Sequence, residues 1–260
     1  MKHPERLGKY PLTGVLGEGA MGVVYKAHDP VIHRPVAHKP IRKPLADGSE
    51  SGAMMAARFR NEAQAAGRLQ HPGIVGVYEY GEDDDVAYIA MEYVEGNSLA
   101  HYIQREVRFS DADILSVMIQ LLDALDHAHE QGVWHRDVKP ANLIITRAGK
   151  LKVADFGIAR IESVGLTQVN SLIGTPSYMA PEQYLGESLD RRVDIWAAGV
   201  LLYQLLTAKL PFTGTAEAVT KGLKRPATEY VPAGRTRLAF REAVLPLLEA
   251  HDALLSPTAP

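Results

Sequence analysis

The sequence predicts an α+β fold with two unequal lobes, a small β-rich lobe followed by a larger, mostly helical one. Short β-branched runs fill the first third of the chain, whereas helical patterns dominate after Gly96. Residues 92–96 form the connection between the two patterns. A chain of 260 residues is long enough for one large domain or for two small lobes that share a cleft.

The composition is that of an ordinary globular protein, with 46% hydrophobic and 23% charged residues. A formal net charge of −3 gives no strong field that would favour nucleic acid or anionic lipid as a partner. The absence of cysteine excludes disulfides, thiolate nucleophiles and cysteine-based metal sites. Residues 1–8 are polar, and the longest apolar stretch, 195–206, is too short to cross a bilayer. We expect a cytoplasmic protein with no membrane segment in this chain.

The first half is expected to contain the strands of the small lobe and one helix. Apolar runs on either side of a glycine-rich turn predict a hairpin, and further runs of the same kind predict more strands. These strands are expected at residues 15–16, 23–26, 36–39, 74–78 and 87–91. The segment 54–69, rich in Ala, Arg, Glu and Gln, predicts a helix, and the segment 47–52 before it predicts a flexible loop.

The second half is expected to be helical. A capping box at residues 110–113 opens a helix whose apolar residues recur at helical spacing. The apolar face is expected to contain Leu115, Met118, Leu122 and Leu125. A second apolar helix is expected at 193–207 and an amphipathic one at 238–248. The last residues, 256–260, contain two prolines and are expected to fray.

Residues 17–22 read Gly-Glu-Gly-Ala-Met-Gly, a turn in which backbone N–H groups can approach phosphate oxygens without a Cβ in the way. Taken alone, this hexapeptide is more typical of an ordinary glycine-rich hairpin. A dinucleotide-binding turn is disfavoured because it needs a helix directly after the last glycine. The β-branched run at residues 23–25 follows instead.

Lys39 ends the predicted strand 36–39 and would lie under the glycine-rich turn, where its ammonium group can bridge the α- and β-phosphates of a nucleotide. A lysine in that position needs an anionic partner to hold it. Glu62, in the middle of the predicted helix 54–69, is the natural candidate. A surface glutamate would look the same in the sequence.

The most informative segment is His-Arg-Asp-Val-Lys-Pro-Ala-Asn at residues 135–142, which follows the capped helix and is expected to lie in a loop. Phosphoryl transfer needs positioning and charge neutralisation more than covalent help. Asp137 would orient the attacking hydroxyl, Lys139 would balance charge on the γ-phosphate, and Asn142 would ligate Mg²⁺. Asp155, in an Asp-Phe-Gly segment, would hold the metal that bridges the β- and γ-phosphates.

These segments together resemble the protein kinase family, and closely the bacterial serine/threonine kinases. The resemblance covers about residues 8–215. Each piece alone is weak, but the ordered set is specific. The matching positions are Gly17, Gly19, Gly22, Val24, Val36–Lys39, Glu62, His135–Asp137, Lys139, Asn142, Asp155–Gly157, Gly174–Pro176, Ala180–Glu182, Asp194, Trp196 and Gly199.

The resemblance implies a two-lobed protein kinase fold, with a small antiparallel-sheet N-lobe that carries one helix at residues 8–94, a mostly helical C-lobe at 95–255 and a frayed tail at 256–260. It implies that ATP and Mg²⁺ bind between the lobes. Val24 and Ala37 would cover the adenine, Ile144 would lie beneath it, and Glu92 and Val94 would offer it backbone hydrogen bonds. The residues implied to contact ATP are Leu16, Gly17, Glu18, Gly19, Ala20, Met21, Gly22, Val23, Val24, Ala37, Lys39, Met91, Glu92, Val94 and Ile144. The implied catalytic residues are Asp137, Lys139, Lys39 and Glu62, and the implied metal ligands are Asn142 and Asp155.

The resemblance also implies an activation loop at residues 158–179, in which Thr167 and Ser171 are candidate phosphorylation sites. Arg136 would pair with such a phosphate and order the loop. Val169 stands where relatives often have a second threonine, so the double-phosphorylation switch of those relatives is not implied here.

Two departures from the family pattern lie beside Lys39. His38 stands where the family usually has an aliphatic residue, and strand alternation should point it away from Lys39 and from the nucleotide. Pro40 removes one backbone donor from the strand.

A third departure lies at the C-terminal end, where only residues 213–260 follow Phe212. At least one helix of the C-lobe is expected to be missing, so this lobe is shortened. An arginine of that region would pair with Glu182 in the family pattern. Arg235, Arg237 and Arg241 are open candidates for this role.

We expect the protein to phosphorylate serine or threonine on protein substrates with Mg-ATP and to autophosphorylate in its activation loop. Autophosphorylation in trans would use a homodimer. Two alternatives remain open. The filled catalytic positions argue against a pseudokinase that serves as a binding scaffold, whereas the shortened C-lobe argues faintly for it. A small-molecule kinase would share the site, although such kinases rarely carry the segments seen here at 174–176 and 180–182.

Overall fold

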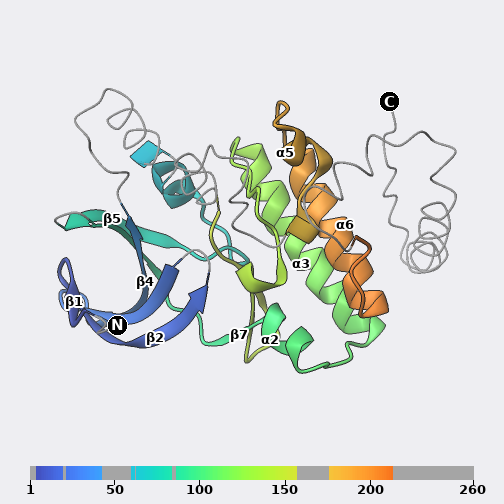
Figure 1. Ribbon diagram of the computed structural model, residues 1–260. Coiled ribbons are helices and arrows are strands. Elements are labelled where there is room, and N and C mark those ends of the chain that lie inside the picture. The colour runs from blue at the N-terminus through green and yellow to red at the C-terminus, as the bar shows by residue number, and fades with distance from the viewer. Residues whose placement is uncertain are drawn as a thin grey trace, which may run out of the picture.

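The computed structural model describes residues 4–19, 22–42, 60–61, 63–83, 86–156 and 176–212. Within these residues, a six-stranded sheet forms one side of the molecule and helices form the other (Figure 1). This arrangement confirms the predicted α+β fold with a small sheet lobe and a larger helical lobe. The predicted shortening of the C-lobe, the helix at 238–248 and the tail at 256–260 fall outside the described residues.

The sheet of the small lobe has the strand order β1-β2-β3-β4-β6-β5, and every neighbouring pair is antiparallel. Its strands are β1 (Arg6–Leu7), β2 (Tyr10–Gly19), β3 (Gly22–Asp29), β4 (Arg34–Arg42), β5 (Val77–Asp83) and β6 (Val86–Glu92). The predicted strands at 15–16, 23–26, 36–39 and 87–91 lie within β2, β3, β4 and β6 and are confirmed. The pairing of β4 with β3 ends at His38, so at Pro40 the strand pairs only with β6. Pro40 is tolerated there because proline is accepted where one side of a strand is unpaired.

The strand predicted at 74–78 begins too early. Residues 74–76 run against the large lobe, where Ile74 forms an isolated parallel bridge to Val153 and the amide of Val75 donates to the carbonyl of Val153 (2.9 Å). Both Ile74 and Val75 are buried. This apolar run is therefore a buried crossing between the lobes, and β5 starts only after it.

Part of the helix predicted at 54–69 lies within the described residues, of which 60–61 and 63–68 are helical. Ala63 is buried in a cluster of the small lobe, whereas Ala66 is buried in the core of the large lobe. The C-terminal part of this helix therefore packs against both lobes.

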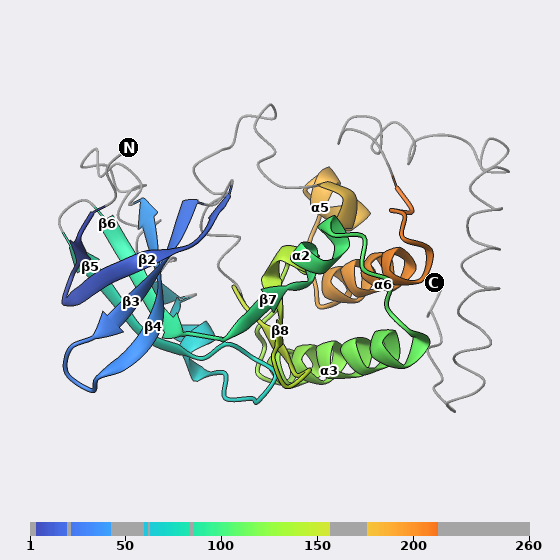
Figure 2. The ribbon, with the colours of Figure 1, turned by 90° about the horizontal axis from the view of Figure 1, so that it is seen from below.

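The large lobe is built on two helices, α3 (Asp111–Glu130) and α6 (Arg192–Thr207), which lie side by side (Figures 1 and 2). Shorter helices accompany them, namely α2 (Leu99–Gln104), α5 (Pro181–Leu185), η1 (Pro140–Asn142) and η2 (Pro176–Tyr178). A small antiparallel sheet consists of β7 (Gly96–Ser98), β8 (Leu143–Thr146) and β9 (Leu151–Val153). Among the described residues, no helix has the length and apolar character needed to span a membrane.

The capping box predicted at the start of α3 is present. The hydroxyl of Ser110 accepts from the amide of Asp113, and the amide of Ser110 donates to the Asp113 carboxylate, both over 3.2 Å. The predicted apolar face is confirmed at Met118 and Leu125, which are buried, but was wrong at Leu115 and Leu122, which are only half-buried. The face that is buried contains Ile114, Val117, Met118, Leu121, Ala124, Leu125 and Ala128. Apolar residues surround the first half of α3, so packing rather than the local pattern selects the buried face.

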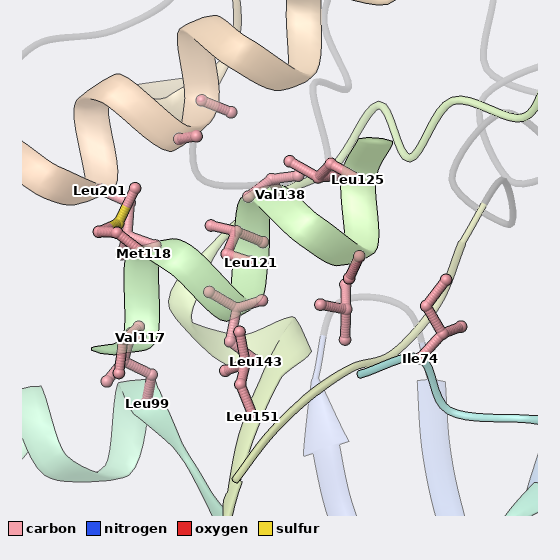
Figure 3. Close-up of a cluster of buried hydrophobic side chains, with 14 of the residues drawn as sticks. Ile74, Leu99, Val117, Met118, Leu121, Leu125, Val138, Leu143, Leu151 and Leu201 are labelled. Atoms are coloured by element: carbon pink, nitrogen blue, oxygen red, sulfur yellow. The ribbon is translucent and has the colours of Figure 1, made fainter. Parts of the chain in front are cut away.

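One apolar core joins the helices of the large lobe to the β8–β9 hairpin. Figure 3 shows side chains from α2, α3, α6 and the hairpin meeting around Leu121 and Leu143. Ile74, from the crossing segment, and Val138, from the loop before η1, belong to the same core. The segments of the large lobe that carry the candidate site residues are therefore packed on one hydrophobic core.

His38 lies in the interior of the small lobe. It has no exposed surface and sits between the rings of Tyr10 and Tyr88, whose centroids are 5.2 and 4.6 Å away. The register of β4 places it on the face opposite Lys39, as predicted. Among the described residues, neither ring nitrogen of His38 has a hydrogen-bond partner. Burial lowers the pKa of His38 to about 4, although the negative charge of Glu79 opposes this shift.

Replacing His38 with valine should raise the free energy of unfolding by about 1–2 kcal/mol near neutral pH, because the change removes a buried polar ring that makes no hydrogen bond. The difference should widen in acid. The unfolded histidine binds a proton below its ordinary pKa of 6.5, whereas the folded one does so only near pH 4. Wild-type stability therefore falls as the pH drops through this window, and the variant lacks this part of the loss.

Urea unfolding of both proteins at about pH 8 and about pH 5 measures this difference. His101→Ala, at an exposed histidine, is the control and should track the wild type at both values. A gap between His38→Val and wild type that is the same at the two pH values would contradict the prediction.

Candidate active site

The charged residues selected from the sequence converge where β4 faces the chain that follows β9. Lys39 lies on β4, opposite Ile89 of β6. Its Nζ is 3.2 Å from Oδ2 of Asp155. Lys39 is only 2% exposed, and an ammonium group so far from water requires an anionic partner. Glu62, the partner expected from the sequence, lies outside the described residues, and Asp155 makes the described ion pair.

Asp137, Lys139 and Asn142 form one hydrogen-bonded group in the loop after α3. Lys139 Nζ is 2.6 Å from Oδ2 of Asp137. Asn142 Nδ2 donates to the same oxygen (3.1 Å) and to the carbonyl of Asp137 (2.9 Å). Because the amide nitrogen of Asn142 is directed at Asp137, its amide oxygen can be presented to a cation. Asp137 has a second carboxylate oxygen, which these bonds do not use and which can accept a hydroxyl proton.

Asn142 and Asp155 supply the kinds of oxygen that suit Mg²⁺. Their segments are linked, because the amide of Ala154 donates to the carbonyl of Asn142 (2.9 Å). In the part of the chain that the structure describes, no group of three His, Cys, Asp or Glu side chains could hold a metal ion by itself. A divalent cation at Asn142 and Asp155 would therefore take further oxygens from a phosphate ligand and water, as Mg²⁺ commonly does.

Two residues of this region have a left-handed backbone, with φ of 66° at Arg136 and 64° at Asp155. A non-glycine residue in that conformation costs on the order of 1 kcal/mol or more, and it persists where the surroundings hold it in place. Both segments should therefore have identifiable anchors.

Asp194, in the first turn of α6, anchors the segment of Arg136. Its carboxylate has no exposed surface and accepts from the amides of His135 (2.8 Å) and Arg136 (2.6 Å) and from Nε2 of His129 (2.8 Å). Burial alone would raise the pKa of Asp194, but the bond from His129 and the two backbone amides outweigh it. The pKa of Asp194 therefore lies below its usual range, and the group stays ionised while it holds the loop.

His135 anchors the segment of Asp155. Its ring is fully buried, with Nε2 2.9 Å from the carbonyl of Ala154 and Nδ1 accepting from the amide of Asp137 (3.3 Å). A carbonyl only accepts, so these contacts assign the ring proton to Nε2. The ring also packs against Phe156, with centroids 4.7 Å apart. His135 thus connects the loop of Asp137 to the chain that carries Asp155.

Several apolar residues expected around adenine lie together. One cluster contains Val24, Ala37, Met91 and Val94, together with Ala154, which the sequence did not single out. Ile144, the residue expected beneath adenine, is half-buried on β8 and is not among the members of this cluster that the structure describes. Leu16 is 43% exposed near the end of β2.

The glycine-rich turn forms the end of the β2–β3 hairpin, as the flanking strands predict. The described pairs are Gly17 with Val24, Glu18 with Val23, and Gly19 with Gly22. Gly22 has φ of 98°, a conformation that residues with a side chain rarely adopt. Other residues selected from the sequence fall outside the described residues, namely Ala20, Met21, Gly157, Thr167, Val169, Ser171, Gly174, Thr175, Arg235, Arg237 and Arg241.

Sequence reasoning missed two residues that hold the loop around Arg136. It matched Asp194 to a family position without a role, and it gave none to Gln183. The Nε2 of Gln183 donates to the carbonyl of Arg136 (2.9 Å), and its Oε1 accepts from the amide of Ala180 (2.8 Å). These partners are 47 and 58 residues from Arg136 along the chain, so no local pattern reveals them.

Replacing Asp194 with asparagine should lower the free energy of unfolding by about 2–4 kcal/mol, because an amide NH₂ would face donors that now share one carboxylate. Chemical unfolding measures the loss. Asp190→Asn is the matched control, since this carboxylate is 46% exposed and pairs with Arg192 at the surface. The control should lose less than about 1 kcal/mol. An Asp194 variant as stable as the control would contradict the anchoring role.

Comparison with known proteins agrees with this geometry. Residues 10–237 match the model of the protein kinase domain family. The chain is 46% identical over 222 residues to a probable serine/threonine-protein kinase of Streptomyces coelicolor, covering 82% of this chain and 32% of that relative. It is 42% identical over 238 residues to serine/threonine-protein kinase PrkC of Bacillus subtilis, covering 91% and 36%.

A third relative, serine/threonine-protein kinase pkn3 of Myxococcus xanthus, is 37% identical over 260 residues, covering 94% of this chain and 47% of the relative. The chain therefore spans about a third to a half of the length of these relatives. With a family match over most of its length and a site that assembles the family's motif residues, this chain belongs to the protein kinase family and groups with its bacterial serine/threonine members.

Proposed function

We propose that the protein transfers the γ-phosphate of ATP, bound with Mg²⁺, to serine and threonine hydroxyls of protein substrates. The observation that carries this proposal is the hydrogen-bonded group of Asp137, Lys139 and Asn142 beside the Lys39–Asp155 ion pair. These residues supply the charges that phosphoryl transfer requires. A pseudokinase scaffold is not favoured, because the described motif positions are filled by residues that can act.

The nucleotide would be held by charges from both lobes. Lys39 is placed to pair with the α- and β-phosphates, with Asp155 keeping its ammonium group in position. When bound, Mg²⁺ neutralises the phosphates and orients the γ-phosphate for transfer. Asp155 and Asn142 would hold this metal through a carboxylate and an amide oxygen. The main-chain bond from Ala154 to Asn142 keeps these two ligands in a fixed relation.

The accepting hydroxyl would be oriented by Asp137. The oxygen of Asp137 that contacts neither Lys139 nor Asn142 can accept the hydroxyl proton as the phosphate is transferred. Lys139 lies beside Asp137 and is therefore placed to balance charge on a phosphate that reaches a hydroxyl bound there. Both side chains are mostly shielded from water, which strengthens these interactions.

Protein rather than small-molecule substrates are supported by the names of the relatives and by the segment 180–182, which opens α5. The next residue, Gln183, holds this segment against the loop of Asp137 through the carbonyl of Arg136. We further propose that the N-lobe spans 8–94 and the C-lobe 95–255, with a tail at 256–260. The protein would act in signalling in the cytoplasm, where ATP is supplied. It would also autophosphorylate on Thr167 or Ser171 through a homodimer.

Asp137→Asn should reduce phosphate transfer by at least about 100-fold, because the amide cannot accept the hydroxyl proton. Lys39→Met should reduce phosphate transfer to a similar extent, because the α- and β-phosphates lose the ammonium group that would hold them. The assay is incorporation of labelled phosphate from Mg-ATP into the purified protein and a generic protein substrate, with sites assigned by peptide mapping. Asp123→Asn, at an exposed position of α3, serves as the control and should retain activity. Activity in Asp137→Asn equal to the wild type would refute the assignment.

A further inference from the structure

Lys152 joins three segments that are distant in the sequence. It lies on β9, and its Nζ is 2.8 Å from both carboxylate oxygens of Glu92, the last residue of β6. The same ammonium group donates to the carbonyl of Ile74 in the crossing segment (3.3 Å). The Glu92 carboxylate also accepts from the amide of Gly76 (3.2 Å). The Lys152–Glu92 bridge therefore links β9, the crossing segment and the end of β6.

This bridge lies on the part of the chain that is expected to face the adenine of ATP. Glu92 directly precedes the connection at residues 93–95 between the lobes, and Val94 within this connection packs with Ala37 and Met91. The amide of Glu92 already donates to the carbonyl of Gly76 (2.8 Å). Of its two backbone groups, only the carbonyl is therefore left to form a hydrogen bond with adenine. The sequence-based expectation of backbone hydrogen bonds from Glu92 is narrowed accordingly to that carbonyl.

The other end of the bridge lies on β9, which leads to Asp155, a proposed metal ligand. Lys152 is on the strand that leads to Asp155, and β9 is itself bonded to the crossing segment. The amide of Val153 donates to the carbonyl of Gly73 (2.8 Å) and its carbonyl accepts from Val75 (2.9 Å). The backbone on the large-lobe side is thus already fixed. Glu92 is tied to it indirectly, through its bonds to Gly76, and directly, through the charge of Lys152.

Because the Lys152–Glu92 pair is mostly buried, its two charges should interact more strongly than those of a surface ion pair. The side chains of Lys152 and Glu92 are 19% and 26% exposed, so water competes less for either charge. By contrast, Lys150, on the same hairpin, is exposed. The two lysines therefore offer a matched comparison of the same chemical change in two environments.

We propose that Lys152 is a positioning residue for ATP: it holds the adenine-facing start of the connection at a fixed place relative to Asp155. This inference rests on the proposed function, because it assumes that a nucleotide spans the two places. Without the ammonium group, Glu92 keeps its backbone bond to Gly76 but loses its link to β9. The connection should then sample orientations in which adenine and the phosphates are not held together.

The test compares Lys152→Met with Lys150→Met. Lys152→Met should raise the KM for ATP about fivefold while kcat changes less than about twofold, because an interaction common to ground and transition states is lost. Lys152→Arg should recover most of the wild-type KM, since a guanidinium can still bridge Glu92. Lys150→Met should leave both constants unchanged. Glu92→Gln, which keeps an acceptor for the amide of Gly76, should reproduce the Lys152→Met effect.

Calorimetric titration with Mg-ATP in the Asp137→Asn background reads binding without turnover. Failure of the parent Asp137→Asn protein to bind ATP would count against the proposed function itself. Binding by the parent with unchanged affinity in Lys152→Met would overturn the positioning role alone. The double variant Lys152→Met with Glu92→Gln gives a second test. If its fold-loss of affinity equals the product of the two single losses, the positioning role is also overturned, because partners in one bridge should not act independently. If Lys152→Met does not fold, Glu92→Gln and Lys152→Arg decide the question.

Discussion

The buried carboxylate of Asp194 is the interaction on which the rest of the site depends. It has no exposed surface, and it accepts the amides of His135 and Arg136, so the loop that carries Asp137 is held against α6. The left-handed backbone at Arg136 would be unfavourable without this support. The ring of His135 then extends the same anchoring to the chain before Asp155. One buried charge thus positions the proposed base and a proposed metal ligand together.

The two lobes are coupled by more than the connection at residues 93–95. The crossing segment is bonded to the backbone of β9, and the helical residues before it contribute Ala66 to the large-lobe core. Lys152 adds a charged link to Glu92. If the angle between the lobes changes, either the backbone after Gly76 must change its conformation, or several of these hydrogen bonds must break. Lys39 lies on β4, which pairs with β6 in the sheet, and its ammonium group contacts Asp155.

Features set by local physics could be read from the sequence, whereas features set by distant contacts could not. The pairing of β2 with β3 around the glycine-rich segment and the capping box at Ser110 are local, and both are present. The buried face of α3 was predicted correctly at Met118 and Leu125 but not at Leu115 and Leu122, because packing decides which face is buried. The run at 74–78 was misplaced because Ile74 is buried against Val153 rather than within the main sheet. The anchoring role of Asp194 was missed because its partners lie 58 and 59 residues away.

Native-state hydrogen exchange at the amides of His135 and Arg136 tests the central claim most directly. If Asp194 holds this loop, both amides should exchange as slowly as those in the core of α6, through global unfolding. Their exchange should be much slower than that of the exposed turn at residues 147–150, between β8 and β9. Exchange of the two amides as fast as in that turn would show that the loop opens independently, and would contradict the account.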